Sequence, residues 1–206
     1  MFTGIITTQG KFKGYLQQRS IIMIESESII AELLIGESLA VDGVCLSLAD
    51  KKKNIGYFHL SQETKTKTTL GHLPTGWSLN LEPPLRLESF LSGHLVTGHV
   101  DGTGKIIHFA HRPPGKRIRV KYNPALRPFL IPKGSIALNG VSLTIAQLTP
   151  SYFECELIPL TLTTTNLGQL KVGHEVNLEC DIIGKYMYNL LSKLGLLGLQ
   201  NRINHD

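Results

Sequence analysis

The apolar residues of this chain gather in short runs rather than in long periodic stretches. Three runs near the start are rich in β-branched and aromatic residues and end at turn-forming Gly, Asp, Asn or Lys: residues 20–25, 38–48 and 57–60. Three similar runs follow later in the chain: residues 116–122, 135–146 and 152–158. Runs of this length and composition are typical of β-strands. Because no long helical pattern alternates with them, the sequence predicts an all-β fold made of small closed barrels.

The later runs repeat the earlier ones. Residues 38–47, SLAVDGVCLS, align with residues 135–144, SIALNGVSLT, at an offset of 97 positions. The same offset continues without a gap through the rest of the copy, whereas the offset is 94 at the front of each copy. Repetition in a fixed register predicts two homologous tandem domains and a tail, with these bounds: residues 1–90, 95–182 and 183–206.

The tail has a different pattern. Its apolar residues recur at steps of three and four positions: Ile183, Tyr186, Met187, Leu190, Leu191 and Leu194. This spacing predicts a C-terminal α-helix with one apolar stripe, ending near Gly195. A stripe outside two closed barrels needs a cover, and two alternatives stay open. Either the helix folds back on its own barrel, or it packs against the same helix of other subunits.

Composition narrows the function classes. The 206 residues carry 21 Lys and Arg against 16 Asp and Glu, a net charge of +5, and this small excess is not gathered in one segment. The strands also lack an aromatic platform, so we expect no nucleic-acid partner. Three widely spaced cysteines, no charged leader and no apolar span free of charges predict a cytoplasmic protein without disulfides or membrane segments.

Three positions differ in chemistry between the copies. His99 stands where the first copy has Ile5, Cys45 stands opposite Ser142, and Asp181 stands where the first copy has proline. A titratable or nucleophilic side chain that only one copy carries is not required by the fold, so each is a candidate for function. The structural alternatives are a strand histidine, a small buried cysteine and a cap of the tail helix. The sequence has no standard cofactor or metal signature, and we expect neither.

Five motifs, in order along the chain, carry a resemblance to a known family. They are MFTGI at residues 1–5, GVCLS at 43–47, GHLVTGHVDGTG at 93–104, GVSLT at 140–144 and NLECD at 177–181. With the duplication, they make the chain similar to the riboflavin synthase alpha chain over residues 1–195. The resemblance implies two six-stranded Greek-key barrels and a C-terminal helix, assembled as a homotrimer without cofactor or metal.

The resemblance also implies a transferase. Riboflavin synthases convert two molecules of 6,7-dimethyl-8-ribityllumazine into riboflavin and 5-amino-6-ribitylaminouracil by moving a four-carbon unit from one to the other. Each barrel binds one copy of the molecule, and the two copies meet between the N-terminal barrel of one subunit and the C-terminal barrel of its neighbour. Lumazine synthase is a further partner that the resemblance implies.

Carried over position by position, the resemblance implies two pockets. The expected N-terminal pocket comprises Gly4, Ile5, Ile6, Ser38, Cys45, Leu46, Ser47, His59, Leu60, Ser61, Gln62, Glu63 and Thr64. The expected C-terminal pocket comprises Gly98, His99, Val100, Lys133, Ser142, Leu143, Thr144, Ile158, Pro159, Leu160, Thr161, Leu162 and Thr163.

The expected chemistry needs few groups, because the 7-methyl protons of the lumazine are unusually acidic. His99, backed by Ser142 and Asp181, is the candidate for proton transfer, and Cys45 or a nearby hydroxyl or water is the candidate for addition at C7. Leu160 departs from the Glu or His of many family members. The alternative function is a lumazine- or flavin-binding protein without catalysis on the same fold. Because both copies keep the Gly-Val-x-Leu-Ser/Thr motif, the sequence favours the enzyme.

Overall fold

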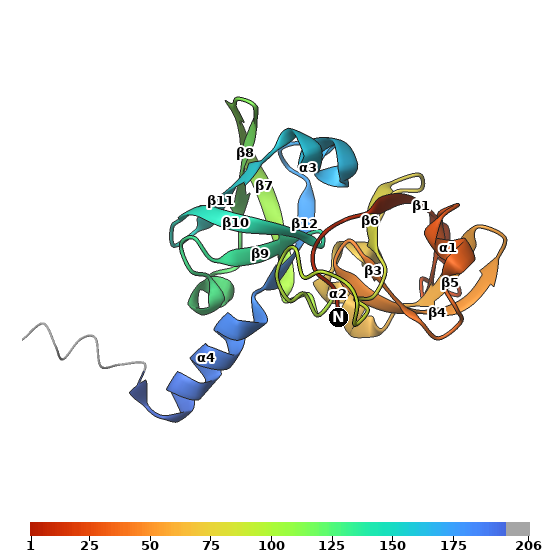
Figure 1. Cartoon of the computed structure of the whole chain (residues 1–206), viewed down its shortest axis with the longest axis horizontal. Coiled ribbons are helices and arrows are strands. Elements are labelled where there is room, and N and C mark those ends of the chain that lie inside the picture. Colours follow the sequence, from red (N-terminus) through yellow and green to blue (C-terminus); the bar gives the residue numbers. More distant parts are fainter. Residues whose placement is uncertain (197–206) are drawn as a thin grey trace, which may run out of the picture.

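The computed structural model describes residues 1–196 and consists of two closed antiparallel barrels followed by a helix (Figure 1). The first barrel has six strands: β1 (Thr8–Leu16), β2 (Ile21–Glu25), β3 (Ser38–Val41), β4 (Val44–Lys52), β5 (Ile55–His59) and β6 (Ser78–Glu82). The second also has six: β7 (Gly102–Arg112), β8 (Gly115–Lys121), β9 (Ser135–Leu138), β10 (Val141–Leu148), β11 (Tyr152–Leu157) and β12 (Glu175–Cys180). The predicted all-β fold of two six-stranded barrels is confirmed.

The two barrels share one topology. Their strands follow the orders β1-β2-β5-β4-β3-β6 and β10-β11-β8-β7-β12-β9, which are the same cyclic order when equivalent strands are compared. Even the irregularities repeat, because the register shifts between Phe12 and Gly14 on β1 and between Ile106 and His108 on β7. Such bulges curve a strand and help to close a barrel. The duplication read from the sequence therefore extends to backbone detail.

Short helices connect the strands at equivalent places. The α-helical segments are α1 (Ile29–Glu32), α2 (Gln62–Lys67), α3 (Pro159–Thr164) and α4 (Ile182–Lys193), and the 3-10 turns are η1 (Thr69–Gly71), η2 (Pro124–Phe129) and η3 (Asn166–Gly168). α2 and α3 lie at the same position of the repeat, after the fifth strand of each barrel. The part of the chain that the structure describes has no helix long and apolar enough to cross a membrane.

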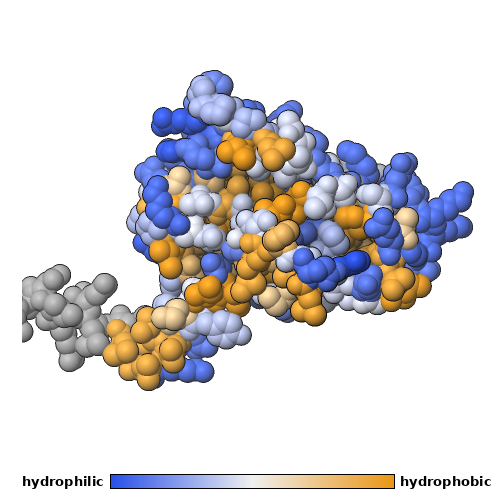
Figure 2. Space-filling model, in the orientation of Figure 1, coloured by the Kyte–Doolittle hydropathy of each residue, from blue (hydrophilic) through white to orange (hydrophobic). Residues whose placement is uncertain are grey.

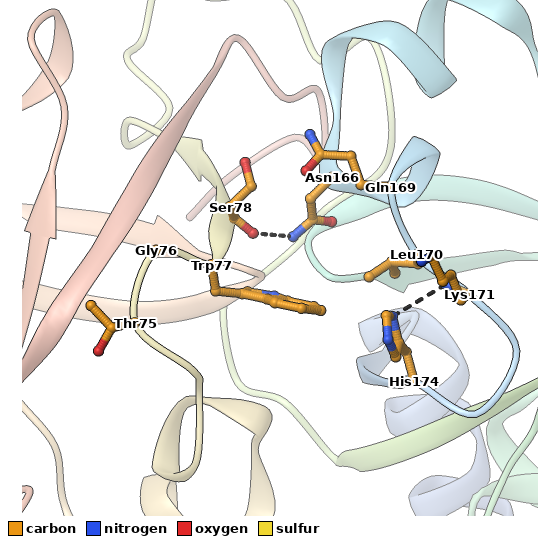
Figure 3. Close-up of a pocket in the computed structure, with 9 residues that line it drawn as sticks. All are labelled: Thr75, Gly76, Trp77, Ser78, Asn166, Gln169, Leu170, Lys171 and His174. Atoms are coloured by element: carbon orange, nitrogen blue, oxygen red, sulfur yellow. Dashed lines mark hydrogen bonds between the residues drawn. The ribbon is translucent and has the colours of Figure 1, made fainter.

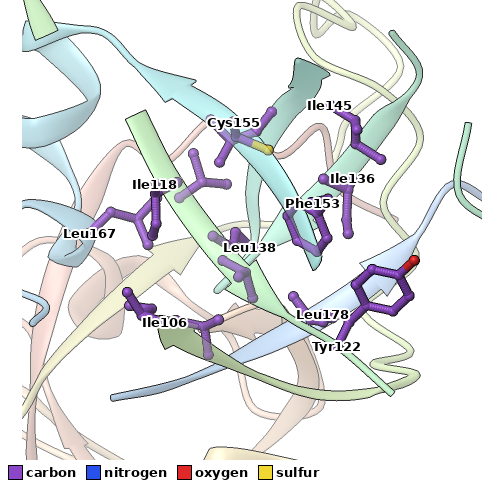
Figure 4. Packing of buried hydrophobic residues seen from close by; sticks show 14 of the residues in the cluster. Ile106, Ile118, Tyr122, Ile136, Leu138, Ile145, Phe153, Cys155, Leu167 and Leu178 are labelled. Carbon is purple, nitrogen blue, oxygen red and sulfur yellow. The ribbon is translucent and has the colours of Figure 1, made fainter. Parts of the chain in front are cut away.

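Each barrel has its own hydrophobic core. Strand residues alternate between the core and the surface, as β4 does from Val44 to Leu48, so that the barrel interior fills with aliphatic and aromatic side chains. Figure 4 shows this packing in the second barrel, where Phe153 lies among isoleucine and leucine side chains. Ile6 belongs to this second core although it precedes the first barrel in the sequence.

The segment in front of each barrel crosses to the other barrel. The Ser142 N–H on β10 donates to the Gly4 carbonyl at 2.8 Å, and the Cys45 N–H on β4 donates to the Gly98 carbonyl at 2.9 Å. Val100 correspondingly packs against the first core, as Ile6 packs in the second. The chain therefore ties its two barrels together by exchanging two equivalent segments.

A buried polar network joins the barrels next to this exchange. The Asp42 carboxylate accepts hydrogen bonds from the Asn80 backbone at 2.7 Å and the Asn166 side chain at 2.8 Å. Asn139, the counterpart of Asp42, accepts from the Asn177 backbone at 2.8 Å. The other carboxylate oxygen of Asp42, Oδ2, is buried and has no hydrogen-bond partner among the described residues.

The predicted C-terminal helix is present as α4, which projects from the second barrel (Figure 1). Asp181 caps it, since its Oδ1 accepts from the Ile183 N–H at 3.0 Å. Gly184 is buried, and the Tyr188 ring packs on Phe129 of η2 at 5.2 Å between ring centroids. The helix thus contacts its own barrel on one side only. Residues 197–206 of the predicted tail lie outside the described residues.

The predicted apolar stripe of α4 is largely uncovered by the chain itself. Five of its side chains are between 51% and 70% exposed: Ile183, Tyr186, Met187, Leu190 and Leu194. Figure 2 shows the helix as a mostly apolar projection. Of the two covers that the sequence left open, the chain's own barrel is therefore not the one that covers this stripe within residues 1–196.

Candidate functional site

A cavity of about 250 Å³ lies in the N-terminal barrel beside β4 and α2. Its lining comes from three places in the chain: Val44 and Cys45 on β4, Ser61, Glu63, Thr64, Lys67 and Thr68 around α2, and Gly98, His99 and Val100 before β7. The cavity thus combines one thiol, several hydroxyls, an imidazole and an ion pair. These groups can donate to and accept from a polar heterocycle and its hydroxylated chain.

Local geometry explains why α2 begins where it does. The Ser61 hydroxyl accepts a hydrogen bond from the Thr64 N–H at 3.0 Å, which caps the first turn of the helix. One turn later, Glu63 and Lys67 form an exposed ion pair at 2.8 Å. The hydrogen bond from Lys67 lowers the pKa of Glu63, so this carboxylate is charged at neutral pH. The mouth of the pocket therefore carries one fixed anion and one cation.

The approach of Gly98 to Cys45 requires glycine. Gly98 has φ +82°, and a Cβ placed there would lie 2.4 Å from the Cβ of Cys45. Gly4 has the same role in the other barrel, with φ +76° and a Cβ that would lie 2.7 Å from the Cβ of Ser142. Close backbone contact at these two points sets the segments directly against β4 and β10.

The C-terminal barrel has an equivalent place with different chemistry. The offset of 97 places Ile158 opposite Ser61 and Leu160 opposite Glu63, and these two side chains are 56% and 65% exposed. The N-cap residue Ile158 gives α3 no side-chain cap, unlike Ser61 on α2. The C-terminal barrel thus presents apolar side chains at the positions where the Cys45 pocket presents a hydroxyl and a carboxylate.

A histidine outside the expected residues lies at Ser142. The Nδ1 atom of His94 is 2.7 Å from the Ser142 hydroxyl, and its Nε2 is buried without a hydrogen-bond partner among the described residues. Burial lowers the pKa of His94, although the negative charges of Asp181 and Glu179 act in the opposite direction. The imidazole is therefore neutral at pH 7 and able to accept a proton.

The structure corrects the expected grouping of the site residues. His99 lines the Cys45 pocket, together with Gly98 and Val100, rather than joining Ser142 in the C-terminal barrel. Conversely, Gly4 lies against Ser142, and Ile6 enters the second core. The physical reason is the exchange of the two leading segments, which places each of them on the barrel of the other copy.

The remaining expected contacts are distributed around the two barrels. The apolar residues among them differ in solvent exposure: Leu46, Leu60 and Leu143 are buried, Leu162 is half-buried and Ile5 is exposed. Ser38 on β3 pairs with Ser47 on β4, and in the second barrel Ser135 on β9 pairs with Thr144 on β10 in the same way. His59, Gln62, Lys133, Pro159 and Thr163 are exposed, and Thr161 is half-buried. Asp181 begins α4 and contributes charge near His94.

Two observations concern other kinds of site. A larger cavity of about 420 Å³ lies between the barrels, where Trp77 faces His174 with 5.3 Å between ring centroids (Figure 3). It contains none of the expected site residues. Within residues 1–196, no group of three or more His, Cys, Asp or Glu side chains is placed to hold a metal ion.

Comparison with known proteins agrees with the duplication. The lumazine binding domain matches this chain twice, at residues 3–83 and 97–181. The riboflavin synthase of Bacillus subtilis (strain 168) is 37% identical over 195 residues, which are 94% of this chain and 91% of that protein. The riboflavin synthase of Mycobacterium tuberculosis (strain H37Rv) is 36% identical over 202 residues, covering 95% of this chain and all of that protein.

Solved structures share the fold. LumP complexed with riboflavin has a TM-score of 0.79 and 24% identity, covering 87% of this chain and 99% of LumP. LumP complexed with 6,7-dimethyl-8-(1'-D-ribityl) lumazine has a TM-score of 0.77, again with 24% identity, covering 87% of this chain and 98% of LumP. The sequence relatives share more than a third of their residues over nearly the whole chain. The two barrels of this chain are its two copies of the lumazine binding domain, and the chain belongs to the riboflavin synthase family.

Proposed function

We propose that this protein is a riboflavin synthase, a transferase that converts two molecules of 6,7-dimethyl-8-ribityllumazine into riboflavin and 5-amino-6-ribitylaminouracil. The observation that carries the proposal is the pair of equivalent barrels in a chain of this family, each with a leading segment set against its fourth strand. A reaction between two molecules of one compound needs two binding places of one shape. A duplicated barrel supplies them, and holding both molecules in contact removes much of the entropic barrier.

In this proposal the two places have different roles. His94, neutral and hydrogen-bonded to Ser142, takes the acidic 7-methyl proton of the lumazine bound at the C-terminal barrel. The Cys45 thiol, or a hydroxyl or water near it, adds at C7 of the lumazine bound at the N-terminal barrel. His99 contacts the molecule in the Cys45 pocket, since it lines that pocket.

The charge difference between the places supports unequal binding. Ser61, Glu63 and Lys67 offer polar partners for ribityl hydroxyls in the N-terminal barrel, whereas Ile158 and Leu160 offer none in the C-terminal barrel. Riboflavin and lumazine therefore bind more tightly beside Cys45 than beside Ser142.

The assembly that we propose is a homotrimer held by α4. Its exposed stripe of five large apolar side chains needs a cover, and a second and third copy of the same helix offer a complementary surface. Each reaction site then lies between the Cys45 pocket of one subunit and the Ser142 side of its neighbour. We place the protein in the cytoplasm, because its three cysteines are free and a reducing compartment keeps them so.

One experiment separates this proposal from a binding protein without catalysis. The purified protein is incubated with 6,7-dimethyl-8-ribityllumazine alone, and riboflavin is followed by its absorbance. The proposal requires riboflavin to appear, with two lumazines consumed for each riboflavin formed. If the lumazine binds and is recovered unchanged, the protein is a carrier of lumazine or flavin instead.

A further inference from the structure

Two glutamates at one position of the repeat hold the exchanged segments. Glu179 on β12 accepts three hydrogen bonds from the segment before β7. Its Oε1 accepts from the backbone N–H and from the hydroxyl of Thr97, both at 2.7 Å, and its Oε2 accepts from the Gly98 N–H at 3.0 Å. The side chain is almost fully buried, with 2% exposed.

Glu82 on β6 makes the same three bonds to the N-terminal segment. Its Oε1 accepts from the backbone N–H and the hydroxyl of Thr3 at 2.7 Å, and its Oε2 accepts from the Gly4 N–H at 3.0 Å. Glu82 is also buried, with 5% exposed. We call each glutamate with the three hydrogen bonds that it accepts a clamp. The two clamps match bond for bond, although the chain between the leading segment and the glutamate is three residues longer in the second copy.

Each clamp belongs to one barrel and acts at the pocket of the other. Glu179 lies in the C-terminal barrel, yet the segment that it holds continues into Gly98, His99 and Val100, which line the Cys45 pocket of the N-terminal barrel. Glu82 lies in the N-terminal barrel, and the segment that it holds places Gly4 against Ser142. A carboxylate is the group best suited to this task, because it accepts all three donors at once through charge-assisted bonds.

We propose that Glu179 and Glu82 are positioning residues that act across the barrels, Glu179 for the Cys45 pocket and Glu82 for the Ser142 side. The effect of the clamps on substrate binding rests on the proposed function. Their effect on the structure does not, because removal of a clamp should open one particular pocket whether or not the protein turns over lumazine. Glutamine has the same size as glutamate but only one accepting oxygen, so Glu179→Gln and Glu82→Gln are matched variants that each lose acceptor capacity and the charge.

The first experiment needs no ligand and uses Cys45 as the reporter. Cys155 and Cys180 are buried, and burial raises the pKa of both thiols, that of Cys180 to about 12, whereas Cys45 is half-buried in the pocket. Iodoacetamide therefore modifies Cys45 first. We expect Glu179→Gln to speed modification of Cys45 by about tenfold, equivalent to about 1.4 kcal/mol in the opening of the segment. Glu82→Gln should change that rate far less, because the segment that Glu82 holds reaches the Cys45 pocket only through the pairing of Phe2 with Val96.

The crossed pattern distinguishes positioning from a general loss of stability. Both variants lose equivalent bonds, so their melting temperatures should fall together, and only the site of opening should differ. Equal rates of Cys45 modification in the two variants, or a faster rate in Glu82→Gln, would overturn the inference. If Glu179→Gln does not fold, Thr97→Val with Thr3→Val as its control removes one bond from each clamp and gives the same comparison.

A second experiment connects the clamps to turnover. Riboflavin should protect Cys45 of the natural protein from iodoacetamide. Glu179→Gln should need about tenfold more riboflavin for the same protection, whereas Glu82→Gln should need the same amount and yet turn over lumazine more slowly. Protection that is equally weak in both variants would contradict the crossed arrangement. If the natural protein makes no riboflavin, the proposed function fails, while the rates of Cys45 modification without ligand still decide the inference about the clamps.

Discussion

The Nδ1 atom of His94 lies 2.7 Å from the hydroxyl of Ser142, which joins the segment before β7 to the β10 strand of the second barrel. The backbone N–H of His94 donates to the Thr3 carbonyl at 3.1 Å, so the residue is held where the N-terminal segment crosses that barrel. The other ring nitrogen is buried and unpaired within the described residues. Because the second ring nitrogen is buried, a proton from a molecule bound beside Ser142 would reach this base through the Ser142 hydroxyl.

His94→Gln tests this role. Glutamine can keep a hydrogen bond to Ser142 but cannot take a proton, so we expect kcat to fall by about a hundredfold or more, the usual contribution of a positioned general base. His99→Gln is the matched control on the same segment. It should weaken lumazine binding at the Cys45 pocket and raise KM. Steady-state kinetics of both variants provide the test, and a larger fall of kcat in His99→Gln would assign the proton transfer to His99 instead.

The pH dependence of turnover gives a second test of His94. Burial lowers the pKa of His94 below its ordinary value of about 6.5. The neutral, proton-accepting form therefore persists to lower pH than it would in a solvent-exposed histidine. We expect kcat to stay level as the pH falls through 6.5 and to decline only at lower pH, measured between pH 5 and pH 9. A decline centred at or above pH 6.5 would show that another group is the base.

Asp42→Asn should stabilise the protein at high pH. Burial raises the pKa of Asp42 to about 8, opposed by hydrogen bonds from Asn80 and Asn166. Because the folded pKa exceeds the unfolded one, the stability linked to this proton is complete below about pH 4 and is lost as the pH rises towards 8. We expect the free energy of unfolding of Asp42→Asn to exceed that of the natural protein increasingly from pH 5 to pH 8, by about 1 kcal/mol or more at the upper end.

Urea unfolding at pH 5, 7 and 9 measures this difference. Asn139 occupies the same position in the second copy, so Asn139→Asp is the control and should lower the free energy of unfolding as the pH rises. If the natural protein and Asp42→Asn differ by a constant amount at all three pH values, Asp42 does not titrate in the folded protein.

Removal of the chain after Gly184 tests the role of α4. The exposed apolar stripe would be deleted, while both barrel cores lie earlier in the chain and stay complete. We expect the shortened protein to sediment as a monomer and to keep a cooperative thermal transition. Sedimentation velocity makes the measurement, and a shortened protein that still sediments as a trimer would show that the barrels assemble without α4.

The sequence predicted the all-β architecture because each run that reads as a strand in one copy recurs in the other, whereas β1, β6, β7 and β12 lie outside those runs and the six-stranded barrel was implied by the resemblance. A pattern seen once is ambiguous, but the same turn and strand pattern occurs twice, 97 residues apart. The two copies therefore predict equivalent strands in the two barrels. The cap at Asp181 was likewise among the alternatives, and its bond to Ile183 confirms it.

The exchange of segments was not predictable in the same way. Alignment of the copies identifies Gly4 with Gly98, but it does not say which barrel each segment contacts, because both barrels present an equivalent surface. The pockets were therefore grouped with the wrong leading segments. His94 was missed for a related reason, since the first copy has no residue aligned with it and a comparison of copies cannot mark it as different. Its place in the GHLVTGH motif was the available signal.

The helices at the pockets were also missed. α2 and α3 are only six residues long and contain two and three threonines, which disfavour helix, so the sequence pattern gave no sign of either helix. Ser61 caps the start of α2, whereas α3 has no side-chain cap. Both helices share a threonine hydroxyl that donates to a carbonyl one turn earlier, from Thr68 to Thr64 and from Thr165 to Thr161, each at 2.7 Å.

Complementation between two blocked variants tests the central claim most directly. Thr64 lines the Cys45 pocket and Thr161 is its counterpart, so Thr64→Trp fills one place and Thr161→Trp fills the other. Each variant alone should make no riboflavin from lumazine. The two variants are then unfolded together in equal amounts and refolded. If every reaction site pairs the N-terminal barrel of one subunit with the C-terminal barrel of the next, about a quarter of these pairs have both binding places open. The refolded mixture should therefore make riboflavin at about a quarter of the natural rate. A refolded mixture that stays inactive would contradict the shared site.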